Sequence, residues 1–75
     1  MKFYLFSWHG IVHGLSYSEE EVRKYIEDGF LKKAGWHFVL EQDLVNENNH
    51  KVKTLEDLKE AKKRYQHAHS TSSLH

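Results

Sequence analysis

The chain has 75 residues, 29% of them charged, and its eleven Lys and Arg residues balance its eleven Asp and Glu residues. A domain of this length buries only about 60% of the surface that its unfolded chain exposes, so its aromatic and aliphatic side chains must supply most of the stability. The absence of cysteine excludes disulfides and thiolate metal sites. Balanced charge disfavours proteins that depend on many phosphate contacts, because each neutralised phosphate needs a cation.

The N-terminal apolar run does not have the pattern of an export signal. It ends at Ser7, and no small-residue cleavage site follows it. No stretch approaches the roughly 20 apolar residues that a membrane span needs. Together with the lack of cysteine, this pattern predicts a cytoplasmic protein that does not associate with membranes.

Residues 3–17 have the alternation of a β-hairpin, with His9 and Gly10 as a two-residue turn that needs positive φ. Counting outward from that turn pairs Trp8 with Ile11 and sorts the strand residues onto two faces. One face is predicted to be the core and contains Phe6, Trp8, Ile11, Leu15, Phe38 and Leu40. The opposite face contains Phe3, Leu5, Val12 and Val39 among Ser7, Gly14, His37 and Glu41.

Ser18 and Glu21 form the sequence signature of a capping box, in which each residue bonds the backbone of the other at a helix start. Gly29 is suited to the left-handed position that ends the helix, and Phe30 is then expected to fold back onto Tyr25. The sequence therefore predicts a first helix between Ser18 and Gly29.

The second half of the chain contains a weaker set of signals. Residues 31–35 form a predicted connector, and residues 36–41 a third strand that Leu44 and Val45 extend. A short strand is predicted at residues 52–53. Thr54 then caps a second helix along which basic residues gather at the C-terminal end, as the helix dipole favours.

These elements predict an α+β fold of the order ββαβα. The N-terminal hairpin and the third strand form one small sheet, and two helices pack against it. Residues 1–65 are predicted to form a single domain. Residues 66–75 are small, polar and rich in histidine, which predicts a disordered, flexible tail.

Histidine is the only residue type abundant enough to suggest chemistry, with seven copies. His9 and His13 have a helical metal-ligand spacing, but in a hairpin they do not converge. No nucleophile elbow, phosphate loop or dinucleotide fingerprint is present. No catalytic residue, metal ligand or cofactor is therefore assigned, and the chain is predicted not to be an enzyme.

The apolar surplus on the second sheet face is the main indication of function. Two short helices are too few to cover both faces of the sheet, and exposed apolar patches are typical of contact sites. The predicted partner-binding residues are Phe3, Leu5, Val12, His37 and Val39. The predicted function is a small non-enzymatic protein-interaction module, such as an inhibitor or regulator of a larger protein, and a homodimer through a sheet face or edge is a further arrangement. The alternative is that the second helix crosses to this face.

In size and style the chain is similar to the compact proteins that phages make to redirect host machinery, although no motif carries this similarity. A second hypothesis is a nucleic-acid-binding accessory protein that uses the basic end of the second helix. Its contact residues would be Lys59, Lys62, Lys63 and Arg64. Tyr4, Phe6 and Trp8 are suited to base stacking, but a core role is favoured because the core needs these rings. A histidine-based metal or catalytic protein is the third hypothesis.

Overall fold

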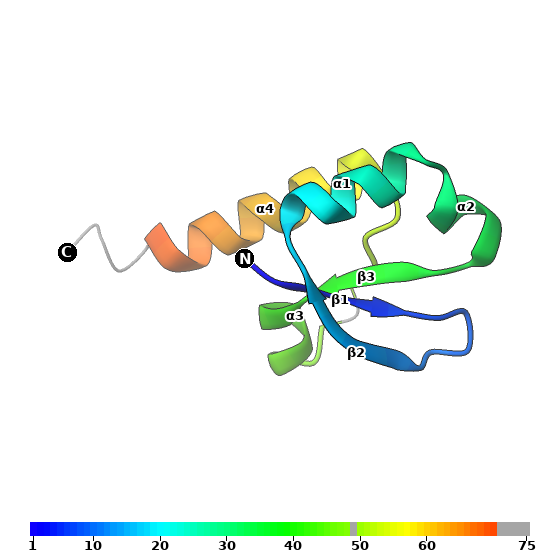
Figure 1. Ribbon diagram of the computed structural model, residues 1–75. Coiled ribbons are helices and arrows are strands. Elements are labelled where there is room, and N and C mark those ends of the chain that lie inside the picture. The colour runs from blue at the N-terminus through cyan, green and yellow to red at the C-terminus, as the bar shows by residue number, and fades with distance from the viewer. Residues whose placement is uncertain (49, 71–75) are drawn as a thin grey trace.

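The computed structural model describes residues 1–48 and 50–70, and within these ranges the strands form one three-stranded antiparallel sheet (Figure 1). Its strands are β1 (Phe3–Phe6), β2 (Val12–Tyr17) and β3 (His37–Leu40), in the order β2-β1-β3. The predicted α+β fold is confirmed. The hairpin forms as predicted, and β3 then pairs with the free side of β1.

The same described ranges contain four helices, two more than the sequence predicts. They are α1 (Glu19–Glu27), α2 (Phe30–Ala34), α3 (Glu41–Val45) and α4 (Leu55–Ser70). Helices α1, α2 and α4 lie on one side of the sheet, and α3 follows the end of β3 (Figure 1). The predicted connector and the predicted extension of the third strand are both wrong, because these segments form α2 and α3.

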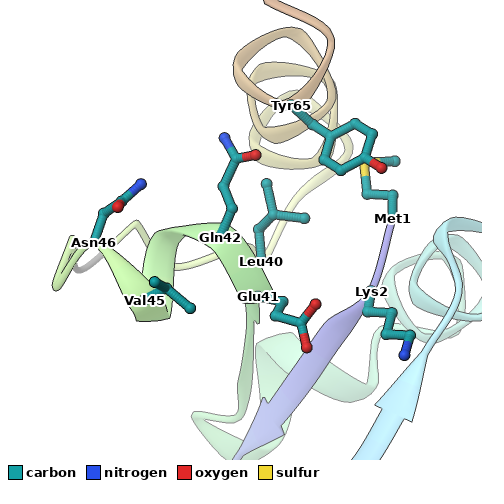
Figure 2. Close-up of a pocket in the computed structure, with 8 residues that line it drawn as sticks. All are labelled: Met1, Lys2, Leu40, Glu41, Gln42, Val45, Asn46 and Tyr65. Carbon is teal, nitrogen blue, oxygen red and sulfur yellow. The ribbon is translucent and has the colours of Figure 1, made fainter. Parts of the chain in front are cut away.

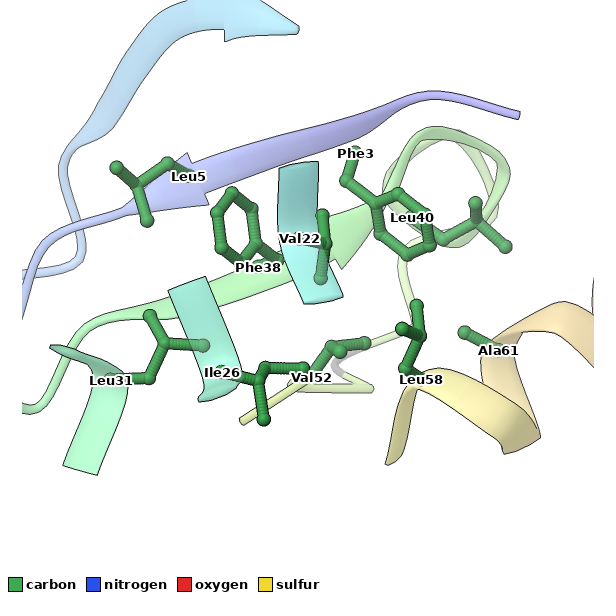
Figure 3. Packing of buried hydrophobic residues seen from close by; sticks show 10 residues of the cluster. All are labelled: Phe3, Leu5, Val22, Ile26, Leu31, Phe38, Leu40, Val52, Leu58 and Ala61. Carbon is green, nitrogen blue, oxygen red and sulfur yellow. The ribbon is translucent and has the colours of Figure 1, made fainter. Parts of the chain in front are cut away.

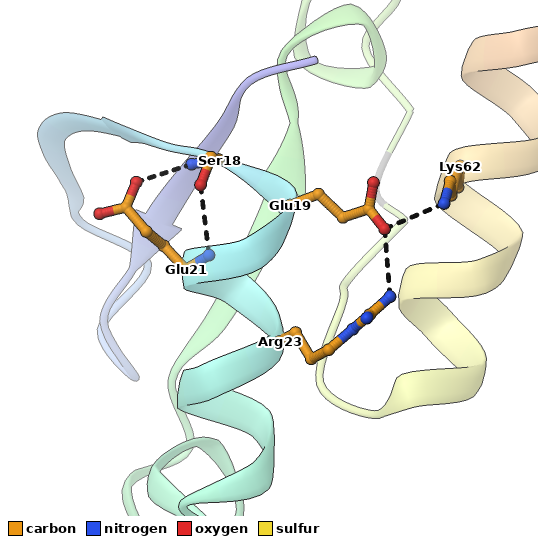
Figure 4. Close-up of polar contacts among 5 residues, drawn as sticks. All are labelled: Ser18, Glu19, Glu21, Arg23 and Lys62. Atoms are coloured by element: carbon orange, nitrogen blue, oxygen red, sulfur yellow. Dashed lines mark hydrogen bonds and ion pairs between the residues drawn. The ribbon is translucent and has the colours of Figure 1, made fainter.

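Both predicted helix starts are confirmed at the level of single hydrogen bonds. The Glu21 amide donates to the Ser18 hydroxyl at 3.2 Å, and the Ser18 amide donates to the Glu21 carboxylate at 2.9 Å (Figure 4). At α4, Thr54 and Asp57 exchange equivalent bonds of 3.1 and 3.3 Å. Gly29 follows α1 with φ of 76°, the left-handed conformation that glycine adopts without steric cost.

The loop of the hairpin differs from the prediction and shifts the register. The Gly10 amide donates to the Ser7 carbonyl at 2.9 Å, and the Ser7 amide donates to the Ile11 carbonyl at 3.0 Å. Gly10 has φ of 81°, whereas His9 does not adopt positive φ. This is a three-residue loop, a turn followed by a left-handed glycine, and not the predicted two-residue turn.

The extra loop residue shifts the strand partners next to the loop by one position, and an irregularity further along β2 shifts the remaining partners in the opposite direction. Phe3 pairs with Tyr17, Tyr4 with Ser16 and Phe6 with Val12, and the register shifts between the last two pairs. Gly14, at φ of 73°, lies within that irregular stretch. The predicted pairing of Trp8 with Ile11 is therefore wrong. A shift of one residue exchanges the two faces of a strand, so the error extends to side-chain placement.

The predicted assignment of the two sheet faces is inverted on the hairpin. Phe3 and Leu5 are buried, whereas Trp8 is 67% exposed. Phe38 and Leu40 are buried as predicted, because they pair across the sheet with Leu5 and Phe3. The core cluster in Figure 3 consists of Phe3, Leu5, Val22, Ile26, Leu31, Phe38, Leu40, Val52, Leu58 and Ala61.

Helix α4 buries Leu58 and Ala61 against this cluster, while Leu55 at its start remains 48% exposed. The helix continues to Ser70, beyond the predicted end of the domain at residue 65. Residues 71–75 of the predicted tail lie outside the described residues. In the ranges that the structure describes, no helix combines the length and the apolar character that crossing a membrane requires.

Candidate functional site

Four large apolar side chains stand exposed on the hairpin. Trp8 is 67% exposed, Ile11 60%, Val12 48% and Leu15 67%, and these four residues are called the hairpin surface below. Trp8 and Ile11 lie in the turn, at the end of the sheet opposite α3, and Val12 and Leu15 lie on β2 (Figure 1). Several large apolar side chains exposed on one short segment of a small domain are typical of a contact site, whereas single exposed apolar residues are common on protein surfaces.

The hairpin surface is held in place by aromatic contacts with the segment before β3. The rings of His13 and Trp36 stack with centroids 4.7 Å apart, and Trp36 in turn contacts Phe30. A Cβ atom added at Gly35 would lie 3.1 Å from the Cβ atom of Trp8, so the two backbones approach closely. These contacts link the hairpin, through His13 and Trp8, to the segment before β3.

The outer face of the sheet, away from α1 and α4, carries two rows of side chains. Across the strands, Ser16, Tyr4 and Val39 form one row. Val12, Phe6 and His37 form the next row. The rings of Phe6 and His37 are nearly parallel, at 7°, with centroids 5.4 Å apart. The outer face therefore continues the apolar character of the hairpin surface through partly exposed rings.

The five predicted partner-binding residues fall into two groups. Phe3 and Leu5 belong to the core, with 0% and 5% exposure, so they offer no surface to a partner. Val12, His37 and Val39 do share the outer face, but Val39 is 5% exposed and His37 is only partly exposed. Whether any of them binds a partner stays a prediction.

Sequence reasoning missed Trp8, Ile11 and Leu15 as surface residues because it assigned them to the core. The signal that could have found them is the charge pattern. No Lys, Arg, Asp or Glu occurs from Phe3 to Ser18, in a chain that is 29% charged overall. Charged residues are absent from both faces of this segment. The pattern therefore indicates that one apolar face is left uncovered, but it does not show which face.

His37 lies on the outer face and has a perturbed pKa. Its partial burial lowers its pKa below the usual histidine value, and the positive charges of Lys51 and Lys53 lower it further. A hydrogen bond with the backbone of Gly35 acts in the opposite direction. The imidazole therefore favours its neutral form, which suits its stacking on Phe6.

Two of the basic side chains near the C-terminal end of α4 form ion pairs with other helices of the protein. Lys62 pairs with Glu19 at 3.1 Å, and Arg23 pairs with the same carboxylate at 3.2 Å (Figure 4). Arg64 pairs at 2.8 Å with Asp43, whose side chain is only 3% exposed. Of the predicted phosphate-contacting residues, Lys59 and Lys63 are exposed, whereas Lys62 and Arg64 hold α4 against α1 and α3.

An open pocket of about 420 Å³ lies between the N-terminus, α3 and α4 (Figure 2). It is lined by Met1, Lys2, Leu40, Glu41, Gln42, Val45, Asn46 and Tyr65. The Tyr4 hydroxyl donates to the Glu41 carboxylate at 2.9 Å, and this bond raises the pKa of Tyr4. In the described part of the chain, no three His, Asp or Glu side chains come together as a metal site.

No protein-family model, curated protein or solved structure matches the chain. The functional argument therefore depends on the exposed hairpin and on its chemistry.

Proposed function

We propose that this chain is a small non-enzymatic protein-interaction module that docks through the hairpin surface, as an inhibitor or regulator of a larger protein. The observation that carries the proposal is the exposure of Trp8, Ile11, Val12 and Leu15 on one hairpin. Burying each of these side chains on a partner would contribute about 1.5–3 kcal/mol before the costs of association are counted. Tryptophan is among the residues that most often dominate binding energy at interfaces.

The placement of Trp8 also supports docking on energetic grounds. Its close approach to Gly35 and the stacking of His13 on Trp36 hold the hairpin before any partner arrives. A surface that is already ordered loses less conformational entropy on binding than a flexible loop. The hairpin is therefore suited to act as a rigid anchor.

The proposal can be tested by capture of binding proteins from a lysate of the native host. Leu15→Glu should remove the captured partner, because it places a charge in an apolar contact that would be desolvated. Lys63→Glu is the matched control, since it changes charge at an exposed position remote from the hairpin, and it should leave capture unchanged. Circular dichroism should show both variants folded. Equal capture by wild type and Leu15→Glu would contradict the proposal.

The nucleic-acid alternative draws less support from the same contacts. Lys62 and Arg64 would have to leave Glu19 and Asp43 to contact phosphates. One observation favours it: Tyr4, Phe6 and Trp8 lie outside the core cluster, although a core role was predicted for them. Binding of this kind would weaken steeply with salt, which separates it from docking through uncharged side chains.

A further inference from the structure

We propose that the outer face of the sheet binds single-stranded nucleic acid, with bases stacked on the rings of Phe6 and Trp8 and with phosphates on Lys51 and Lys53. This inference goes beyond the proposed function, because it assigns a second ligand to the face next to the hairpin surface. It also differs from the use of the basic end of α4. Three observations carry it, which are the placement of the two lysines, the exposed rings beside them, and the charge of the face.

A short segment that pairs with β3 brings two lysines to the outer face. Phe38 exchanges both backbone hydrogen bonds with Val52, at 3.0 and 2.7 Å, and both side chains are buried in the core. Side chains alternate between the two faces of an extended segment, so Lys51 and Lys53, on either side of Val52, lie on the outer face. Partial burial and then the charges of these two lysines lower the pKa of His37, so both ammonium groups lie near that ring.

Each of the two lysines ends a row of side chains that crosses the sheet. In an antiparallel pairing the residues next to a pair are opposite one another, so Lys53 lies opposite His37 and Lys51 lies opposite Val39. The row that contains Phe6 and His37 therefore ends in the cation of Lys53. The two lysines are about 7 Å apart along the backbone, and their long side chains can contact two successive phosphates of one strand.

The rings of Phe6 and Trp8 lie side by side along the chain on the same face. Phe6 is partly exposed, and its ring is stacked against His37 at a centroid distance of 5.4 Å. Ser7 between them is buried, so alternation places Trp8 on the outer face, where it is 67% exposed. The ring centroid of His9 lies 3.6 Å from that of Trp8. Exposed rings of this kind stack bases of any sequence, because every base has a flat π face.

The charge of the outer face favours an anionic ligand. Within the described part of the chain, no carboxylate forms an ion pair with Lys51 or Lys53. The Glu41 carboxylate also lies on this face, but it accepts the hydrogen bond of the Tyr4 hydroxyl at 2.9 Å, so we place no base on Tyr4. An acidic peptide would neutralise the two lysines and leave the rings without stacking partners. The combination of rings and cations therefore favours nucleic acid over an acidic protein segment.

Fluorescence anisotropy of labelled ten-nucleotide strands of thymidine DNA and uridine RNA tests the inference on the full chain. Both strands should bind with a Kd on the order of 10–100 µM at physiological salt. The logarithm of the affinity should fall with the logarithm of the salt concentration with a slope of about −1.4, since each of two phosphate contacts contributes about −0.7. An abasic strand of the same length should bind about tenfold more weakly, because it cannot stack.

Two variants with matched controls place the site. Lys51→Gln should weaken binding severalfold and make the salt slope about 0.7 less steep, whereas Lys63→Gln, an exposed lysine on α4, should change neither. Phe6→Leu should weaken binding about tenfold, because it removes a stacking ring and keeps an apolar side chain. Phe30→Leu removes a partly exposed ring on α2 and should leave binding unchanged. Circular dichroism should show all four variants folded.

The same measurements can overturn the inference. Absence of binding to both strands would do so, as would equal binding of the abasic strand or of a ten-residue glutamate peptide, since the face would then recognise charge alone. Loss of binding in Lys63→Gln but not in Lys51→Gln would place the nucleic acid on α4 instead. The proposed function is judged separately, because its test is the capture of a host protein by wild type and by Leu15→Glu.

Discussion

The two sides of the sheet are built from the same kinds of apolar residue but are used in opposite ways. The inner side, with Phe3 and Phe38, is closed by helices that carry most of the charged residues. The hairpin surface, which includes Trp8 and Leu15, is equally apolar, but no other part of the described structure covers these two side chains. Apolar character alone does not mark a core, and coverage by a second layer decides which residues are buried.

Among the described residues, two of the ion pairs join helices to one another, α1 to α4 and α3 to α4, and a third lies within α1. Glu19 holds both Arg23 and Lys62, and Asp43 holds Arg64. The hairpin has no such pairs, since it contains none of the residues that form them. This difference leads to three predictions, on the apolar side chains of the two regions, on the ion pairs and on His37.

The largest expected effect separates a ring on the closed side from a ring on the open side. Phe38→Ala should lower the free energy of unfolding by about 3–5 kcal/mol, because it leaves a cavity in the core. Trp8→Ala should lower it by less than about 1 kcal/mol, since most of that side chain already contacts water. Urea denaturation of both variants measures the difference. Comparable losses would mean that the hairpin surface belongs to the stabilising core.

A medium effect is expected from the ion pair between α3 and α4. Asp43→Ala should cost about 1–3 kcal/mol, because it leaves the partly buried Arg64 guanidinium without its carboxylate. Glu19→Ala, which removes a more exposed carboxylate, should cost less than about 1 kcal/mol. Thermal denaturation at constant pH compares the two variants. If Glu19→Ala lowered the stability more than Asp43→Ala, the ion pair between α1 and α4 would contribute more to stability than the pair between α3 and α4.

The smallest effect concerns pH and His37 on the outer face. Because the folded state lowers the pKa of His37, the unfolded chain binds this proton at a higher pH. The contribution of neutral His37 is complete above the ordinary histidine value of about 6.5 and is lost as the pH falls below it toward the folded-state pKa. Unfolding curves for wild type and His37→Phe should therefore diverge below that value, with wild type losing more stability. Parallel curves would show that protonation of His37 does not affect the fold.

Local signals in the sequence were reliable wherever the interacting residues lie within a few positions of one another. The capping box at Ser18 and the left-handed Gly29 were both predicted from neighbours along the chain. The presence of a hairpin was also predicted, but its loop was not, since two- and three-residue loops with one glycine have similar sequences. The longer loop and the irregularity in β2 together set the register.

The candidate site was only partly predictable. The sequence indicated an apolar surplus on the sheet and located it on the hairpin and third strand. It assigned Trp8 and Leu15 to the core and Phe3 and Leu5 to the surface, which the structure reverses. Nothing within a few residues of Trp8 shows that the helices cover the other face.

The sequence by itself determined where helices α1 and α4 begin, that residues 3–17 form a hairpin, and that more apolar surface exists than one small core requires. These properties depend on hydrogen bonds and alternation between near neighbours. Only the tertiary structure decided which sheet face is buried and which sheet edge is closed. Both depend on contacts between distant residues, such as Phe38 with Val52 and Asp43 with Arg64, whose partners no local pattern specifies.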